Sequence, residues 1–171
     1  MMIHEFNGLE FLEVDNQAQS ATILLHGYGA SQHDLYPLHE IFGTQCDYYF
    51  PNAPHDIKNM FDGRAWFEID WEDLNRAMMR GDRSRFENKH PIGFDYSLEL
   101  VEKFLESLRP KYKKIILGGF SQGSMLTMHI TSCRPDLVDA FILLSSSLVN
   151  FPKLQQLWTS MSHKPPFIQS H

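Results

Sequence analysis

KKIILGGFSQGSMLTMHI, residues 113–130, joins a short apolar block to a helix-like segment through the pentapeptide GFSQG. The apolar block is typical of a strand buried on both faces, and the pattern over 121–133 predicts a helix that ends before Arg134-Pro135. A Gly-x-Ser-x-Gly sequence between a strand and a helix favours a tight turn that exposes the serine hydroxyl at the end of the strand. Ser121 is therefore a candidate nucleophile. The competing interpretation is a glycine-rich turn in which the serine only caps the helix.

A second motif, LLHGYGAS at residues 24–31, follows an upstream apolar run and fits the nucleophile interpretation. A serine nucleophile needs N–H donors that stabilise an oxyanion, one from the residue after the serine and one from the loop after an upstream strand. Gln122 and Tyr28 occupy these positions. His26 lies at the end of the apolar run and upstream of Ser121. In enzymes that carry a Gly-x-Ser-x-Gly nucleophile turn, the base follows the serine in the sequence, so we interpret His26 as structural.

Around these motifs, strand patterns alternate with helix patterns. Asn7-Gly8 predicts a β-hairpin within residues 2–14. Further strands are predicted at 21–27, 46–54, 113–119, 138–147 and 164–171, and helices at 34–42, 94–108, 121–133 and 151–161. The first of these helices is expected to begin at an Asp34 cap, to end at Gly43, and to have Leu35, Leu38, Ile41 and Phe42 on one face. This alternation predicts an α/β fold, with a mainly parallel sheet and an N-terminal antiparallel hairpin, in a single domain over 1–171.

Residues 55–93 interrupt this order with a long segment that has no strong periodicity. Long irregular segments in compact domains are often lids or binding loops, so we expect a lid or substrate loop here. Its charge-rich part, residues 70–89, is expected to be a solvated surface.

Composition limits the classes of function. The net charge of −6 argues against a nucleic-acid-binding protein, which usually has a basic face. Two cysteines provide neither a disulfide framework nor a metal-site spacing, and the histidines show no metal-binding spacing either. The sequence has no signal-peptide pattern and no apolar run that could span a bilayer. We therefore expect a reduced, cytoplasmic protein that has no metal.

Six strings occur in order along the chain: LLHGYGAS, FPNAP, RAWFEID, IILGGFSQGSMLT, LLSSSL and PPFIQSH. Together they resemble the phospholipase/carboxylesterase family of α/β-hydrolases, which includes the acyl-protein thioesterases and small bacterial carboxylesterases. The resemblance implies an α/β-hydrolase fold and a serine hydrolase of carboxylic esters or thioesters with short to medium acyl chains, without a cofactor. It implies that Ser121 is the nucleophile, that Tyr28 and Gln122 form the oxyanion hole, and that Trp66 belongs to the stretch lining the acyl site.

The same resemblance implies that the catalytic aspartate and histidine follow the strand at 164–171. In the family, that strand leads to a loop with the aspartate, then to a helix, a strand and a loop with the histidine. The sequence ends at His171, so we expect a domain that is incomplete at its C-terminus and weakly active or inactive alone. Asp136 and Asp139 are expected at the far end of the sheet, His129 points away from the turn, and a terminal His171 would be poorly held.

Three hypotheses remain open from the sequence. The chain derives from an active esterase or thioesterase, it is a non-catalytic remnant or acyl-binding module, or it is half of a split enzyme. An exposed edge at the last strand would also favour association between copies of the chain.

Overall fold

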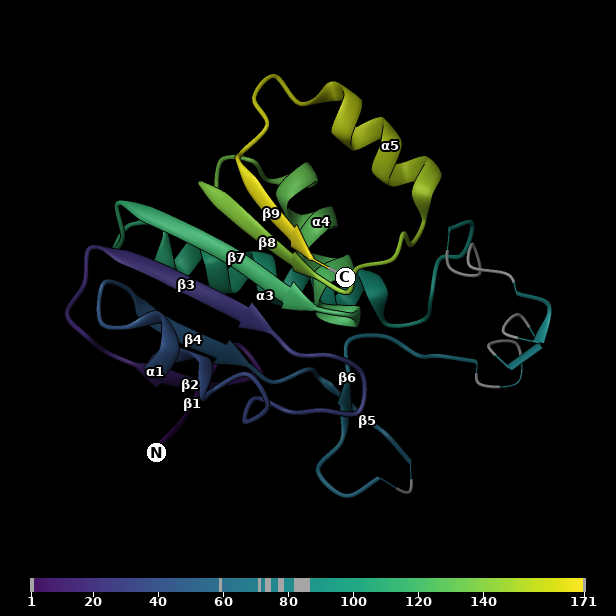
Figure 1. Cartoon of the computed structure of the whole chain (residues 1–171), viewed down its shortest axis with the longest axis horizontal. Coiled ribbons are helices and arrows are strands. Elements are labelled where there is room, and N and C mark those ends of the chain that lie inside the picture. The colour runs from purple at the N-terminus through teal and green to yellow at the C-terminus, as the bar shows by residue number, and fades with distance from the viewer. Residues whose placement is uncertain are drawn as a thin grey trace.

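The structure, a computed structural model, describes residues 2–58, 60–70, 72, 75–76, 79–81 and 87–170. Its frame is a seven-stranded sheet in the order β1-β2-β4-β3-β7-β8-β9 (Figure 1). The strands are β1 (Ile3–Phe6), β2 (Leu9–Val14), β3 (Ser20–Leu25), β4 (Asp47–Pro51), β7 (Lys114–Phe120), β8 (Ala140–Leu144) and β9 (Phe167–Ser170). The β1–β2 and β2–β4 pairs are antiparallel, and all other neighbours are parallel. The predicted mainly parallel sheet with an N-terminal antiparallel hairpin is confirmed.

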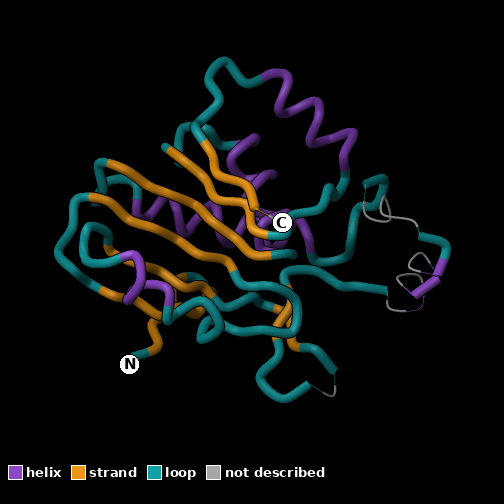
Figure 2. The backbone as a smooth tube through the Cα atoms, in the orientation of Figure 1, coloured by secondary structure: helices purple, strands orange, loops and turns teal. Residues whose placement is uncertain are grey.

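The main helices lie on one face of this sheet. Figures 1 and 2 show α3 (Phe94–Leu108) and α4 (Gln122–Cys133) behind the strands, and α5 (Phe151–Ser160) beside β9. The apolar side of α3 is buried, and its residues join those of α4 and of the odd-numbered positions of β3 and β7 in one hydrophobic core. This packing fixes the start of α4 against the carboxyl ends of the central strands, where ligands bind in open α/β sheets.

The N-terminal hairpin forms as the sequence predicts. Asn7 and Gly8 have φ angles of 51° and 84°. Positive φ at both central residues is the signature of a type I′ turn, whose twist matches that of the two strands.

The helix predicted from Asp34 is wrong in its extent. The structure has only α1 (Leu38–Phe42), preceded by turns, and its N-terminal cap position is Pro37. Proline disfavours helical conformation in the residue before it, so the helix begins after Pro37. Of the four residues predicted to share a helical face, Leu35 lies before the helix, and Ile41 and Phe42 are 76% and 50% exposed.

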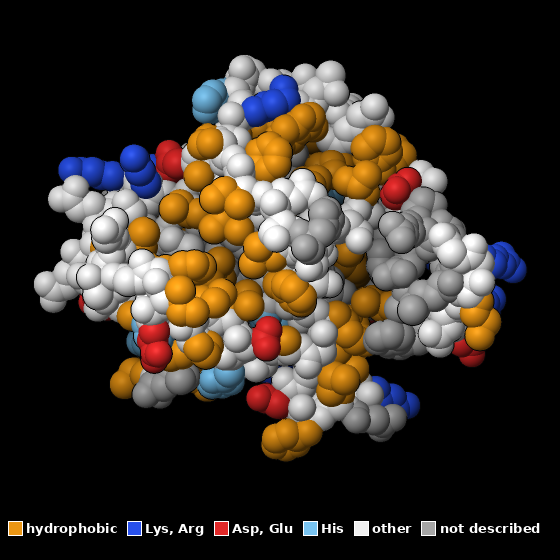
Figure 3. Space-filling model, in the orientation of Figure 1, with side chains coloured by type: hydrophobic (Ala, Val, Ile, Leu, Met, Phe, Trp, Pro, Cys, Tyr) orange, Lys and Arg blue, Asp and Glu red, His pale blue; other side chains and the backbone are white. Residues whose placement is uncertain are grey.

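The second face of the sheet is only partly covered. Leu35, Tyr36 and Leu38 pack on a cluster formed by β2, β3 and β4. Figure 3 shows hydrophobic side chains gathered over the sheet on this face. The strand β9 is the last in the sheet order, and its Ile168 is 67% exposed. This agrees with the apolar sheet edge that the sequence predicts. Association between copies through this strand stays a prediction.

The segment 55–93 contains a two-stranded ribbon, β5 (His55–Asp56) with β6 (Arg64–Ala65), beside the loop that follows β3. The two ends of the charged stretch lie close together, because the Glu68 N–H donates to the Ile92 carbonyl at 3.0 Å. A lid function for this segment stays a prediction, and much of the charged stretch at 70–89 lies outside the described residues.

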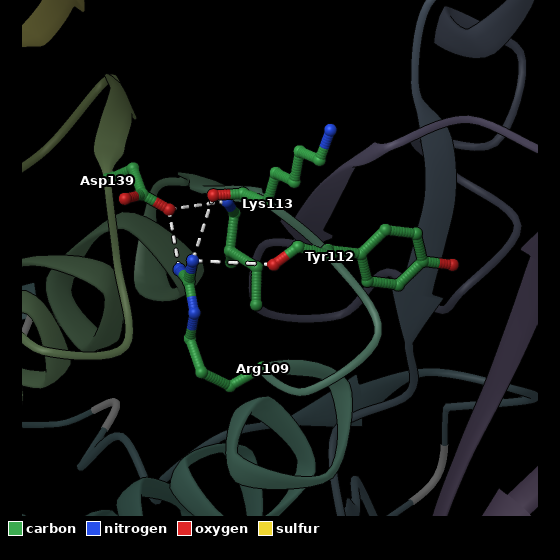
Figure 4. Close-up of polar contacts among 5 residues, drawn as sticks. Arg109, Tyr112, Lys113 and Asp139 are labelled. Carbon is green, nitrogen blue, oxygen red and sulfur yellow. Dashed lines mark hydrogen bonds and ion pairs between the residues drawn. The ribbon is translucent and has the colours of Figure 1, made fainter.

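Asp139 holds the amino end of β7. Its Oδ2 accepts hydrogen bonds from Arg109 Nη1 at 2.6 Å and from the Ile115 N–H at 2.7 Å (Figure 4). Arg109 also donates to the Lys113 carbonyl at 2.9 Å. At about 3.3 Å per residue, the six residues from Ile115 to Ser121 place this carboxylate roughly 20 Å from the serine. Asp139 is therefore structural, at the far end of the sheet as expected.

We expect Asp139→Ala to lower the free energy of unfolding by about 1–3 kcal/mol, because it leaves the Ile115 N–H without its acceptor. Urea unfolding followed by far-UV circular dichroism would measure the loss. Asp136→Ala is the control, because Asp136 pairs with Arg134 at an exposed site and such pairs contribute about 0–1 kcal/mol. Equal losses in the two variants would contradict a specific role for Asp139.

Candidate active site

Ser121 connects β7 to α4 in a conformation that is unusual for a residue with a side chain. Its φ and ψ angles are 50° and −110°. The Ser121 N–H donates to the Leu144 carbonyl at 2.8 Å, and the Ser121 carbonyl accepts from the Ser124 and Met125 N–H groups at 3.1 and 3.2 Å. Strained backbone of this kind persists only where its surroundings hold it, and it concentrates at functional sites.

The two glycines of the motif are required by close backbone packing. A Cβ on Gly119 would lie 2.3 Å from the Gly123 carbonyl carbon, within the turn itself. A Cβ on Gly123 would lie 2.2 Å from the carbonyl oxygen of Leu25, the last residue of β3. The turn at Ser121 is thus pressed against the end of β3, next to the loop that contains Tyr28.

His26 organises the beginning of that loop. The ring is 1% exposed. Its Nδ1 donates to the Gly27 carbonyl at 2.7 Å, and its Nε2 accepts from the Ala53 N–H at 3.0 Å. This arrangement requires the neutral ring, and burial lowers the pKa of His26. These contacts support the interpretation that His26 is structural.

The loop is also paired with the β5–β6 ribbon. The Gly29 N–H donates to the Arg64 carbonyl, and the Arg64 N–H donates to the Ala30 carbonyl, both at 2.9 Å. Tyr28 lies between these contacts and the end of β3. It lines a cavity of about 460 Å³ that is also bordered by residues 54–58 and by Ala65, Glu68 and Ile69. A ligand in this cavity would lie beside the residue expected to supply one oxyanion donor.

Trp66 lies beneath the loop that follows β3. Its side chain is 0% exposed. Its Nε1–H donates to the His26 carbonyl at 2.8 Å, and the two rings are 5.4 Å apart. In this conformation the protein encloses the ring, and a substrate-binding role for Trp66 stays a prediction. The hydrogen bond to His26 makes Trp66 a support of the loop that carries Tyr28.

Gln122 has a contact that the sequence did not suggest. Its side chain is buried, with Oε1 accepting from the Trp66 N–H and Nε2 donating to the Phe67 carbonyl, both at 2.8 Å. The sequence motif assigns only the backbone N–H of Gln122. No local signal points to residues more than fifty positions upstream, in a segment without periodicity.

No described histidine or carboxylate hydrogen bonds to the Ser121 hydroxyl. His129 lies in α4, where its Nε2 donates to the Val149 carbonyl at 2.8 Å. Burial lowers the pKa of His129, so it is a buried structural residue, as expected. His171 lies outside the described residues.

The described residues hold neither a metal-binding cluster of side chains nor a helix that could span a membrane. In that part of the chain, no cluster of three or more His, Cys, Asp and Glu side chains could hold a metal ion. No helix within the described ranges is long and apolar enough to cross a membrane.

Comparisons with known proteins find similar sequences and similar folds. Residues 7–171 match the model of a family described as Phospholipase/Carboxylesterase. Acyl-protein thioesterase 1 of Candida albicans is 31% identical over 143 residues, which are 76% of this chain and 58% of the relative. Acyl-protein thioesterase 1 of Eremothecium gossypii is 27% identical over 165 residues, which are 90% of this chain and 65% of the relative. The chain thus spans less than two thirds of the length of these curated relatives.

Solved structures give the same fold. Esterase PE8 superposes with a TM-score of 0.70 at 27% identity, over 93% of this chain and 71% of that one. Acyl-protein thioesterase 2 of Zea mays superposes with a TM-score of 0.67 over 94% of this chain and 74% of that one. Its identity to this chain is 17%, so it supports the fold alone.

Proposed function

Because the chain belongs to the phospholipase/carboxylesterase family and has its α/β-hydrolase fold, we propose that it hydrolyses carboxylic esters or thioesters with short to medium acyl chains. The reaction passes through an acyl-enzyme on Ser121. The similarity to acyl-protein thioesterases and to an esterase supports this choice of bond.

The observation that carries the proposal is the backbone of Ser121. The positive φ, held between two glycines that tolerate no Cβ, turns the serine out at the carboxyl end of β7 and the start of α4. The first N–H groups of a helix lack partners within the helix and carry partial positive charge, which favours a developing oxyanion nearby.

The proposed steps use few groups. The Ser121 oxygen attacks the carbonyl carbon while its proton passes to a base, and the N–H groups of Gln122 and Tyr28 bind the oxyanion. The intermediate collapses to an acyl-serine and releases the alcohol or thiol with a proton. Water then attacks the acyl-serine, which yields the carboxylic acid and restores the serine. None of the described histidines or carboxylates hydrogen bonds to the Ser121 hydroxyl, and the family resemblance implies that the base and its aspartate follow β9 in sequence.

A non-catalytic acyl-binding protein is the second candidate. The absence of a base hydrogen-bonded to Ser121 among the described residues favours it. An acyl-binding protein would bind a fatty acid or its ester without cleaving it.

Labelling with a fluorophosphonate separates the two candidates. Protein made from the native gene should be modified at Ser121, as identified by mass spectrometry of the proteolytic peptide. Ser121→Ala should abolish the labelling and lower ester or thioester hydrolysis by at least about 10³-fold, because only oxyanion and binding effects remain. Folded protein that binds a fatty acid but is neither labelled nor hydrolytic would contradict the proposal and support acyl binding.

A further inference from the structure

The side chain of Gln122 joins the nucleophile turn to the segment that follows β6. Gln122 is the first residue of α4 and is 2% exposed. Its amide accepts from the Trp66 N–H and donates to the Phe67 carbonyl. Only an uncharged side chain that has both an acceptor and a donor can bond to the Trp66 N–H and the Phe67 carbonyl together. Glutamate without its proton lacks the donor, and methionine lacks both hydrogen bonds.

The hydrogen bonds continue from Trp66 to the loop that follows β3. The indole of Trp66 donates to the His26 carbonyl. Two residues earlier, the backbone of Arg64 pairs with Gly29 and Ala30. Residues 64–67 therefore contact both the first residue of α4 and the loop on either side of Tyr28.

The helix α3 also contacts residues 64–67. The Ser97 hydroxyl, on α3, donates to the Trp66 carbonyl. The backbone of Trp66 is thus bonded on both its N–H and its carbonyl, and its side chain is bonded as well. We call the contacts that run from Gln122 through residues 64–67 to the loop after β3 the bridge. The bridge links the start of α4 to the loop that carries Tyr28.

We infer that the side chain of Gln122 is a positioning residue for the oxyanion hole. By holding residues 64–67 across the turn, it fixes the spacing between its own N–H and the loop of Tyr28. This inference rests on the proposed function. Oxyanion donors act only when they are preorganised, and a misplacement of about 1 Å can lower the rate about 10²-fold.

The test compares Gln122→Met with Thr127→Val. Methionine keeps the length of the side chain and removes both hydrogen bonds to residues 66–67. Thr127 is buried in the same helix, and its hydroxyl donates to the Gly123 carbonyl at 3.0 Å. Its replacement therefore removes a buried hydrogen bond of α4 without touching the bridge. Two readouts are taken on folded protein: the kinetics of Ser121 acylation, and hydrogen exchange of residues 64–67 and 29–30.

Gln122→Met should lower kcat and the rate of fluorophosphonate labelling by about 10–100-fold with little change in KM. It should also speed amide exchange at residues 64–67 and 29–30. Thr127→Val should leave both readouts near the wild-type values, even where its stability falls. Full reactivity of Gln122→Met, or reduced reactivity with unchanged exchange at residues 64–67, would overturn the inference.

Gln122→Glu adds a readout that a purely structural role would not move. A protonated glutamate has both the acceptor and the donor of glutamine, so its labelling rate relative to wild type should rise as the pH falls. A ratio independent of pH would count against the bridge. Wild-type protein without any reactivity at Ser121 would contradict the proposed function instead, and the bridge itself would then be judged by exchange alone.

Discussion

Gly123→Ala is expected to lower the free energy of unfolding by about 3 kcal/mol or more and to remove the reactivity of Ser121. The new Cβ would lie 2.2 Å from the Leu25 carbonyl oxygen and 2.7 Å from the His26 carbonyl oxygen. Both are backbone atoms at the end of a central strand, so neither can rotate away as a side chain could. The turn at Ser121 would have to separate from β3, which would also displace Gln122 from residues 66–67. Urea unfolding and fluorophosphonate labelling measure the two effects.

Gly43→Ala is the matched control for this variant. Gly43 has a φ of 82° at the end of α1, and an added Cβ would meet nothing within 4 Å. Its φ and ψ angles of 82° and −165° lie in a region that is essentially restricted to glycine. Its replacement tests this conformational cost alone, which is about 1–3 kcal/mol. A loss for Gly123→Ala no larger than that for Gly43→Ala would mean that the turn is not pressed against β3.

The sequence predicted the sheet and the turn at Ser121 well because both depend on local patterns. The central strands are largely buried on both faces, so β3 and β7 contain short apolar runs with glycine at or just after their ends. The glycines at 119 and 123 mark places where backbone approaches backbone, which a motif can encode in five residues. The hairpin at Asn7-Gly8 is similarly local.

The sequence pattern predicted local structure less well where a single residue or a contact between distant residues determines it. The helix at 34–42 was predicted from its apolar spacing, but Pro37 delays its start. Trp66 was assigned to the acyl site through the family resemblance, and this assignment stays a prediction. Segment 55–93 has no periodicity from which the burial of the Trp66 side chain could be inferred. The bridge from Gln122 to residues 66–67 spans more than fifty positions and leaves no local signature.

The burial of Trp66 leads to the second large effect. Trp66→Ala is expected to lower the free energy of unfolding by about 3–5 kcal/mol, the range for removing a large aromatic side chain from a core. The ring is fully buried, and its loss would also leave the buried His26 carbonyl without its donor. Trp66→Phe should lose less, about 1–3 kcal/mol, because it keeps most of the apolar surface and removes mainly the hydrogen bond.

Trp158→Ala provides the comparison. Trp158 lies on α5, is only partly buried, and packs against Phe141 with the ammonium of Lys164 5.6 Å from its ring. Its removal should therefore cost less than that of Trp66 when both are measured by urea unfolding. A contact between the ring and the substrate would give a different result. The two variants would then lose equal free energies of unfolding, and folded Trp66→Ala would show a changed KM for esters of different chain length. A large loss of stability in Trp66→Ala, together with an unchanged chain-length preference in Trp66→Phe, would instead indicate that Trp66 supports the loop that carries Tyr28.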